Sequence, residues 1–178
     1  YPDELLYSQL CRYYVRTGYT AYAFAADDLY SKRTVHPDIE FLNKFNDDAL
    51  YWITKYKTLE EIIQQHTMFP VYARFLPKER KSAAHTALIK MEGNWRNLLA
   101  IPNTGERYLM FCPECAKEDR EFFGETYWHR QHQIQRIRIC PKHKCFLLNS
   151  NIRNSGRISP GLYSAEQNIP YDTFKKKD

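Results

Sequence analysis

The sequence lacks several features on which common enzymes and membrane proteins depend. Its six glycines are scattered and form no phosphate-binding loop, and no Gly-x-Ser-x-Gly motif is present. The longest apolar runs, such as residues 98–101, are too short to span a bilayer. Adjacent acids such as Asp47-Asp48 point apart on a helix, whereas a magnesium-dependent nuclease needs separated carboxylates that converge on the metal. These absences favour a protein that is not an enzyme and has no membrane partner.

Acidic residues are also absent from one long segment, between Glu125 and Glu166. The net charge of the whole chain is +5, and its surplus of bases falls within this segment. A basic surface can neutralise nucleic-acid phosphates, although a merely solvated surface is the alternative. We take five of these bases as candidate contacts to double-stranded DNA: Arg130, Arg136, Arg138, Lys142 and Lys144.

The first hundred residues predict short helices joined by short turns. Hydrophobic residues make up 43% of the chain, enough for one domain or two small ones. Helical spacing and start or stop signals predict helices over residues 3–17, 22–29, 39–45, 47–53, 59–65, 77–91 and 94–99. Thr58 and Glu61 form a capping-box pattern, and Gly18 is a helix-ending glycine. This arrangement is compatible with a helix-turn-helix unit, and equally with a plain helical bundle.

The pattern changes after Gly105. Short strands are expected at residues 107–111, 134–139 and 145–148, with a helix at 116–123. The expected fold class is mainly α, with a helical, helix-turn-helix-like part (1–105) packed against a small zinc-ribbon-like finger with short β-strands (106–150). Residues 151–178, which carry Gly, Ser, Asn and Pro, are expected to form a linker or tail.

Two matching knuckles predict a metal site. Cys112-Pro-Glu-Cys115 is followed after 24 residues by Cys140-Pro-Lys-His143. Each knuckle brings two soft ligands close together, and the two complete a tetrahedron, which is the closed coordination of structural zinc. With no position left for water, one Zn²⁺ would hold structure rather than catalyse. Three cysteines in ligand spacing also favour a reduced, intracellular compartment over a disulfide framework.

Three further residues could compete for metal. Cys145 lies two positions after His143 and could take the fourth ligand position, or serve as a small apolar core residue. His129 and His132 form a His-x2-His pair that lacks the glutamate of a metalloprotease motif. We interpret the pair as packing or surface histidines, while a metal hydrolase that uses them stays an alternative.

Several blocks of this sequence resemble the TniQ/TnsD family of bacterial transposon target selectors. They are Tyr1-Pro-Asp-Glu-Leu-Leu-Tyr-Ser, His66-Thr-Met-Phe-Pro-Val-Tyr, Tyr108-Leu-Met-Phe-Cys-Pro-Glu-Cys, Phe123-Gly-Glu-Thr-Tyr-Trp-His-Arg and Cys140-Pro-Lys-His. The family usually has glycine after the histidine of the second knuckle, where this chain has Lys144. The resemblance covers the chain to about residue 148, and the zinc block is its most specific part.

The resemblance implies a target-site selection adaptor in DNA transposition. Such a protein would recognise target DNA, or an RNA-guided Cas complex, and recruit an AAA+ ATPase transposition regulator in the bacterial cytoplasm, at the nucleoid. It implies the amino-terminal TniQ domain, with Cys112, Cys115, Cys140 and His143 as zinc ligands and further DNA-binding regions beyond Asp178. Two alternatives stay open: a zinc-stabilised protein-interaction module, and a zinc-ribbon transcription regulator unrelated to transposition.

Overall fold

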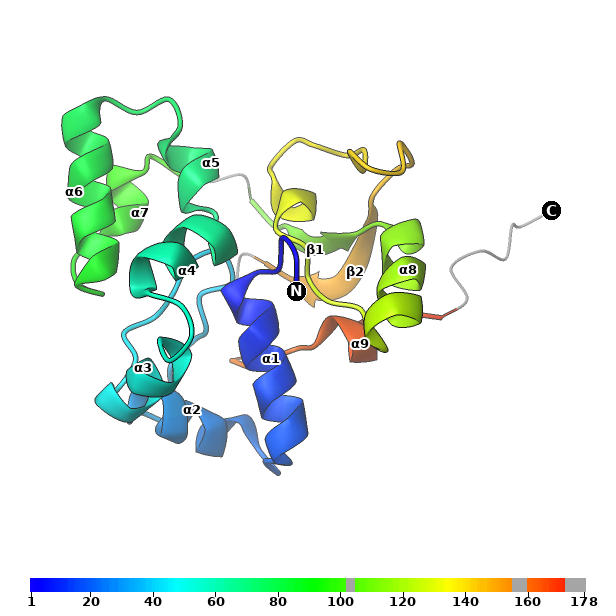
Figure 1. Ribbon diagram of the computed structural model, residues 1–178, viewed down its shortest axis with the longest axis horizontal. Helices are drawn as coiled ribbons and strands as arrows, with labels where there is room; N and C mark the ends of the chain where they lie inside the picture. Colours follow the sequence, from blue (N-terminus) through cyan, green and yellow to red (C-terminus); the bar gives the residue numbers. More distant parts are fainter. Residues whose placement is uncertain (102–104, 155–159, 172–178) are drawn as a thin grey trace.

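The protein, seen in a computed structural model that describes residues 1–101, 105–154 and 160–171, is mostly helical (Figure 1). The predicted fold class, mainly α with a small finger that contains short strands, is confirmed. In chain order the elements are α1 (Leu6–Thr17), α2 (Tyr22–Tyr30), α3 (Asp47–Ile53), α4 (Leu59–His66), α5 (Phe69–Ala73), α6 (Lys78–Ile89), α7 (Trp95–Leu98), β1 (Tyr108–Phe111), α8 (Pro113–Phe123), the 3-10 helix η1 (Gln131–Gln133), β2 (Leu148–Arg153) and α9 (Ala165–Asn168).

The elements lie in two groups with α1 between them. Helices α2 to α7 gather on one side, and the sheet, α8 and α9 lie on the other (Figure 1). The sheet is one antiparallel pair, in which Phe111 of β1 lies opposite Leu148 of β2 and Tyr108 lies opposite Arg153. Its register shifts between Tyr108 and Met110, as a β-bulge would produce. In the described part of the chain, no helix has the length and apolar character needed to cross a membrane.

Local signals set two helix ends as predicted, at Gly18 and at Thr58, whereas α1 begins at Leu6 rather than near residue 3. Gly18 ends α1 in the left-handed conformation, with φ of 71°. The Thr58 side chain accepts a hydrogen bond from the Glu61 N–H, and the Glu61 carboxylate accepts one from the Thr58 N–H, which completes the capping box of α4. Asp47 lies in the first turn of α3, where a negative charge favours the helix dipole. Asp47 and Asp48, the acidic residues of this first turn, therefore stabilise the start of α3.

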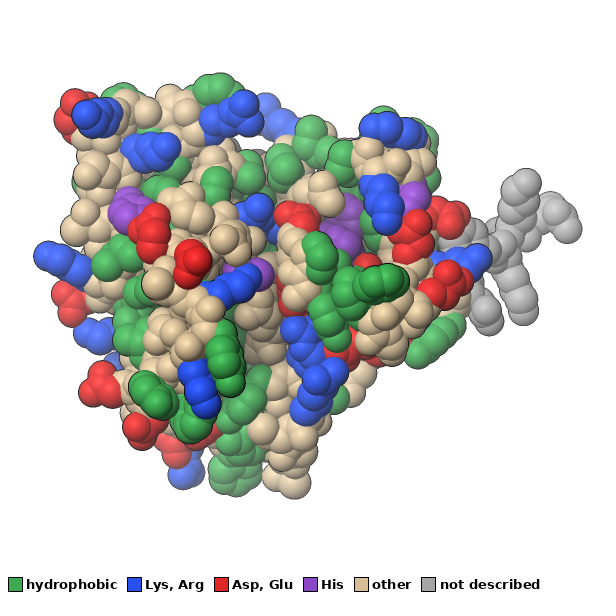
Figure 2. Space-filling view, in the orientation of Figure 1, with side chains coloured by type: hydrophobic (Ala, Val, Ile, Leu, Met, Phe, Trp, Pro, Cys, Tyr) green, Lys and Arg blue, Asp and Glu red, His purple; other side chains and the backbone are tan. Residues whose placement is uncertain are grey.

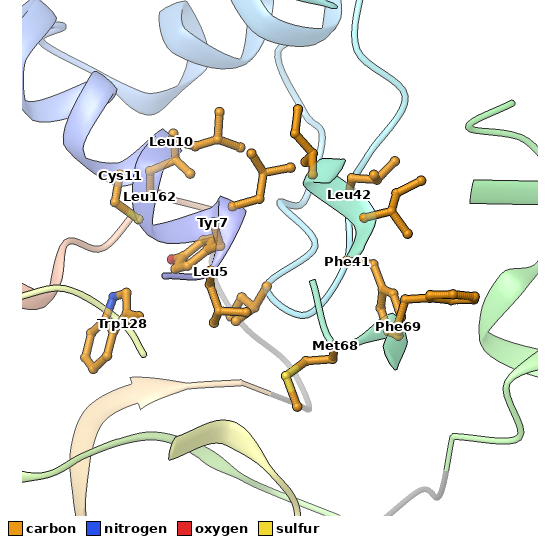
Figure 3. Packing of buried hydrophobic residues seen from close by; sticks show 14 of the residues in the cluster. Leu5, Tyr7, Leu10, Cys11, Phe41, Leu42, Met68, Phe69, Trp128 and Leu162 are labelled. Carbon is orange, nitrogen blue, oxygen red and sulfur yellow. The ribbon is translucent and has the colours of Figure 1, made fainter. Parts of the chain in front are cut away.

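One hydrophobic core crosses both groups of elements. Leu5 and Tyr7 from the amino-terminal part pack in one cluster with Phe41, Trp128 and Leu162 (Figure 3). Trp128 is fully buried, and its indole Nε1 donates a hydrogen bond to the Tyr163 carbonyl at 2.8 Å. The division at residue 105 stays a prediction, and the residues on its two sides share this core.

The amino-terminal segment is bound directly to the finger. The Leu5 N–H donates to the Trp128 carbonyl at 3.1 Å, and the Arg130 N–H donates to the Asp3 carbonyl at 2.7 Å. The Arg130 guanidinium also lies 3.2 Å from the Asp3 carboxylate. Since these bonds join residues more than 120 positions apart, they fix the first turn of the chain against the segment between the two knuckles.

The expectation of a linker from residue 151 onward is wrong for the described residues. Residues 151–153 complete β2, and the segment from 160 onward packs onto the core. Leu162, Ala165 and Ile169 are buried, and Arg120 of α8 forms an ion pair with Glu166 of α9. The reason is that apolar residues before, within and after the short helix α9 (Leu162, Ala165 and Ile169) join the main hydrophobic core. Residues 155–159 and 172–178 lie outside the described part.

Two other predicted elements do not form as expected. Residues 39–45 are not helical, because the Asp38 carboxylate accepts bonds from the N–H groups of Glu40 and Phe41 in a side-chain-stabilised turn. Residues 134–139 do not form a strand, because Arg136 adopts a left-handed conformation with φ of 68°. Only Ile139 pairs there, as an isolated bridge to Phe146. The strand expected at residues 145–148 instead begins at Leu148.

Candidate metal centre

The first knuckle is built by the junction of β1 and α8. Cys112 follows the strand and is the N-cap residue of the helix, with its sulfur accepting a hydrogen bond from the Cys115 N–H at 3.4 Å. Pro113 occupies the first helical position, where its missing N–H has no cost because that N–H would have no partner within the helix. The strand thus delivers one thiol, and the first turn of the helix delivers the other. Both cysteines are buried.

The second knuckle repeats this hydrogen bond in a turn. The Cys140 sulfur accepts from the His143 N–H at 3.4 Å. The Cys140 carbonyl accepts from the Lys144 N–H at 2.9 Å, and the Cys140 N–H donates to the Cys145 carbonyl at 2.9 Å. Lys144 closes the turn with φ of 58°, the position where a glycine would be unstrained. The turn directs both Cys140 and His143 toward the first knuckle.

The four predicted ligands meet at one point. The sulfurs of Cys112, Cys115 and Cys140 and a ring nitrogen of His143 all lie within 4.8 Å of one another. The Cys115 and Cys140 sulfurs are 3.7 Å apart, and His143 Nδ1 lies 3.4 Å from the Cys112 sulfur and 3.3 Å from the Cys115 sulfur. Zinc–sulfur bonds of about 2.3 Å in a tetrahedron place sulfurs about 3.8 Å apart. The cluster therefore has the size and donor set to hold one metal ion.

Because they are buried, the thiols of Cys112 and Cys115 need a nearby positive charge in order to ionise. Burial raises the pKa of Cys112 to about 12 and raises that of Cys115 still further, so both disfavour the thiolate form. Burial acts in the same direction on Cys140, but the N–H groups of His143 and Lys142 outweigh it and lower the pKa of Cys140. A bound cation reverses the preference of the buried thiols, because a coordinating thiol is deprotonated outright.

A carboxylate orients the histidine ligand. His143 directs Nδ1 toward the sulfurs, and its Nε2 lies 3.0 Å from a Glu118 oxygen. Lys142 and His143 both lower the pKa of Glu118, which keeps this carboxylate ionised. A carboxylate on the outer nitrogen selects the tautomer whose inner nitrogen is free to bind metal.

Two buried histidines lie on one side of the cluster: His132 is next to its sulfurs, and His129 packs on His132 with ring centroids 4.6 Å apart. His132 is 1% exposed, and its Nε2 lies 3.7 Å from the Cys115 sulfur and 3.8 Å from the Cys140 sulfur. Burial lowers the pKa of His132 to about 3, so the ring is neutral. His129 is also buried, and its Nε2 lies 2.8 Å from the Asp119 carboxylate. The interpretation of this pair as packing residues agrees with their burial, and no sequence signal placed them beside the cluster.

Cys145 lies at the edge of the cluster. Its sulfur is 3.4 Å from the Cys112 sulfur, but the cluster of mutually close donors does not include it. Cys145 is half-buried, whereas the three cysteines of the cluster are buried. The geometry thus gives the fourth position to His143.

The five candidate DNA contacts lie in different surroundings. Arg130 is turned inward, where it binds Asp3 and the carbonyls of Gln64 and Thr67. Lys142 forms an ion pair with Glu118. The remaining three are exposed and have no acidic partner among the described residues: Arg136, Arg138 and Lys144. As DNA contacts all five stay predictions, and these three have side chains available to a ligand.

A helical body with a four-donor metal cluster at its edge is the arrangement found here, and the sequence places it in a known family. The profile of the TniQ family matches residues 1–147, so the chain belongs to the TniQ family. The chain is also similar to the Escherichia coli protein named transposon Tn7 transposition protein TnsD, with 27% identity over 149 residues. That alignment covers 80% of this chain and 29% of the relative, so the chain spans about a third of the relative's length.

Proposed function

We propose that this chain is a non-catalytic adaptor that selects target sites in DNA transposition. Membership of the TniQ family over residues 1–147 carries the proposal, and the similarity to a Tn7 transposition protein supports a role in target selection. In this proposal the chain recognises target DNA, or an RNA-guided targeting complex, and recruits an AAA+ ATPase regulator. It does so at the nucleoid, in the bacterial cytoplasm.

The metal in this proposal is one structural Zn²⁺. Three sulfurs and one imidazole nitrogen form a soft donor set that suits zinc, and four protein ligands leave no position for a reacting water. Cys112, Cys115, Cys140 and His143 would hold the ion and so fix the two knuckles against each other. Metal analysis of the purified protein tests this assignment, with one equivalent of zinc as the expected result.

The DNA half of the proposal depends on a small number of bases. On the face shown in Figure 2, Lys and Arg side chains are interspersed with Asp and Glu rather than gathered into one broad patch. Contact with phosphates would therefore be local, through exposed bases such as Arg136, Arg138 and Lys144. Such contacts position a protein on DNA without reading its sequence.

Exposed aromatic side chains support the partner half of the proposal. Tyr51, Trp52 and Tyr56, on α3 and just after it, are 63%, 62% and 87% exposed. Trp52 also lines a groove of about 700 Å³ between α1, α2 and α3, whose walls include Leu10 and Ile53. Exposed aromatics beside an apolar groove are typical of protein interfaces. We assign this face to the ATPase.

Capture of the ATPase by the zinc-loaded protein tests the proposal. The assay is a pull-down with the AAA+ regulator of the same transposon, with and without duplex DNA, across a salt series. We expect capture that strengthens with DNA and that Trp52→Ala reduces. Phe75→Ala is the matched control, because Phe75 is 89% exposed but lies after α5, away from the groove.

The possible outcomes separate the two halves. Loss of capture in Trp52→Ala but not in Phe75→Ala supports the assigned face. Equal effects of the two variants refute the face while leaving the adaptor function. Failure to capture the ATPase under any condition, with zinc verified in place, refutes the adaptor function.

A further inference from the structure

A polar pocket lies between the sheet and the segment that follows η1. Its volume is about 370 Å³, at the small end of the range for ligand sites. Residues of β1, of β2 and of the segment after η1 line this pocket, and Figure 1 shows that segment in yellow above the two strands. Among the described residues, its lining includes three arginines, Arg107, Arg136 and Arg138, and one acid, Glu106.

The charges of this lining do not cancel. Arg107 forms an ion pair with the buried Glu40 at 3.0 Å, and Glu106 forms one with Arg153 at 2.9 Å. Arg136 and Arg138 have no acidic partner among the described residues, and the Arg138 guanidinium donates a hydrogen bond to the Met110 sulfur at 3.2 Å. Two guanidinium groups thus line a small cavity, and neither forms an ion pair with an acid in the part of the chain that the structure describes.

The pocket is held open by specific contacts. The Gln133 side chain accepts from the Met110 N–H at 3.0 Å and donates to the Met110 carbonyl at 2.9 Å, so it binds the edge of β1 as a paired strand would. The Gln135 side chain donates to the Tyr72 hydroxyl at 2.8 Å. These bonds fix both ends of the short turn before Arg136, and His132 joins the same wall to the metal cluster. The backbone segment that leads into the two arginines is therefore fixed by bonds within the protein.

Arg136 is also held in a strained backbone conformation. Its φ of 68° is left-handed, which costs a non-glycine residue about 1–2 kcal/mol. The Arg136 side chain is exposed and packs in no core, so stability alone does not explain why an arginine stands there. Backbone strain at an exposed residue that lines a cavity is typical of ligand-binding sites.

We propose that this pocket binds one backbone phosphate of a nucleic-acid strand, held by the guanidinium groups of Arg136 and Arg138. Guanidinium groups bind phosphate oxygens in a bidentate manner, and a pocket of this size admits one phosphodiester rather than a duplex. The inference rests on the proposed DNA-binding role and assigns its anchoring contact. It also gives the metal cluster a second purpose, since the cluster supports the wall that carries His132.

Substitutions of exposed bases provide a matched test. Arg136→Gly removes the guanidinium and keeps a residue that adopts positive φ without strain. Lys81→Ala is the control, because Lys81 is an exposed base of α6 that does not line the pocket and is not one of the five candidate DNA contacts. Thermal unfolding checks that both variants fold, and Arg138→Ala is a second variant in the pocket. Affinity for a duplex oligonucleotide is then measured from 0.05 to 0.3 M salt. Over this range the Debye length is about 14 Å or less, so the measurement reports contacts at short range.

The expected results follow from counterion release. Loss of one phosphate contact reduces the magnitude of the slope of log K against log salt by about 0.9. At 0.1 M salt this corresponds to a roughly eightfold loss of affinity for DNA. We expect this loss in Arg136→Gly and in Arg138→Ala, and a loss below about twofold in Lys81→Ala.

Two results would overturn the inference. Equal losses in Arg138→Ala and Lys81→Ala would mean that a diffuse basic surface binds DNA, so that the pocket assignment fails while the proposed function stands. No salt-dependent DNA binding by the unchanged protein would remove both the pocket assignment and the DNA half of the proposed function.

Discussion

The metal cluster makes a sharp prediction about which cysteines matter. Cys140 and Cys145 are both close to the sulfur or nitrogen atoms of the cluster, but only Cys140 belongs to the set of four mutually close donors. Structural zinc sites have an apparent binding free energy of about 10–16 kcal/mol shared by four ligands, or roughly 3 kcal/mol for each. Cys140→Ser should therefore weaken Zn²⁺ binding by more than about 100-fold. Cys145→Ser should weaken it by roughly tenfold or less, as a neighbour of the ligands does.

Competition with a chromophoric chelator measures both affinities, and Co²⁺ absorption reports the number of thiolate ligands. Cys140→Ser should also keep most of its helical circular dichroism, because the cysteine cluster is separate from the main hydrophobic core. Equal losses of affinity in Cys140→Ser and Cys145→Ser would refute the assignment of the fourth position to His143. Full affinity in Cys140→Ser would refute the metal site itself.

Three further predictions concern stability. Trp128→Ala should lower the free energy of unfolding by about 3–5 kcal/mol, because the indole is fully buried and its removal leaves a cavity. Trp128→Phe should lower it clearly less. Equal losses for the two variants in urea unfolding would contradict cavity formation as the cause. Burial lowers the pKa of His66, so the native state binds fewer protons than the unfolded state. The stability that comes from keeping this imidazole neutral is present above pH ~6.5 and is lost as the pH falls below that value. His66→Gln should therefore show a shallower loss between pH 7 and pH 5.5, by up to about 1.4 kcal/mol per pH unit, and parallel curves would exclude the effect. Thr58→Ala should remove the capping box and cost about 1 kcal/mol in thermal or urea unfolding, whereas no change would mean that α4 does not depend on its cap.

The sequence predicted best where the signal was local. Cys112 and Cys115 lie within one knuckle, and so do Cys140 and His143, so their proximity follows from spacing alone. The capping box at Thr58 and the glycine that ends α1 are likewise decided within a few residues. Local chemistry of this kind does not depend on how distant segments meet.

Prediction was poorer where distant residues decide the outcome. Glu4 is fully buried and binds Arg12 through two bonds of 2.9 Å, and a carboxylate so near the start of the chain would ordinarily be expected at the surface. His132 lies beside the metal cluster because η1 turns back over it, which no residue spacing indicates. The apolar period at residues 39–45 indicated a helix, but bonds from backbone N–H groups to Asp38 determine that conformation instead.

The bonds between the amino-terminal segment and residues 128–131 have a mechanical consequence. Asp3 and Leu5 hold Trp128 and Arg130 by backbone bonds, and a shared core lies behind them. Among the described residues, these bonds and this core join the finger firmly to the helical body. If a bound strand tilts the finger, the helical body should rotate with it. The aromatic face at Trp52 would then rotate by the same angle. The direction in which a partner is presented would then be set by the way the finger is seated, with no change of conformation inside the protein.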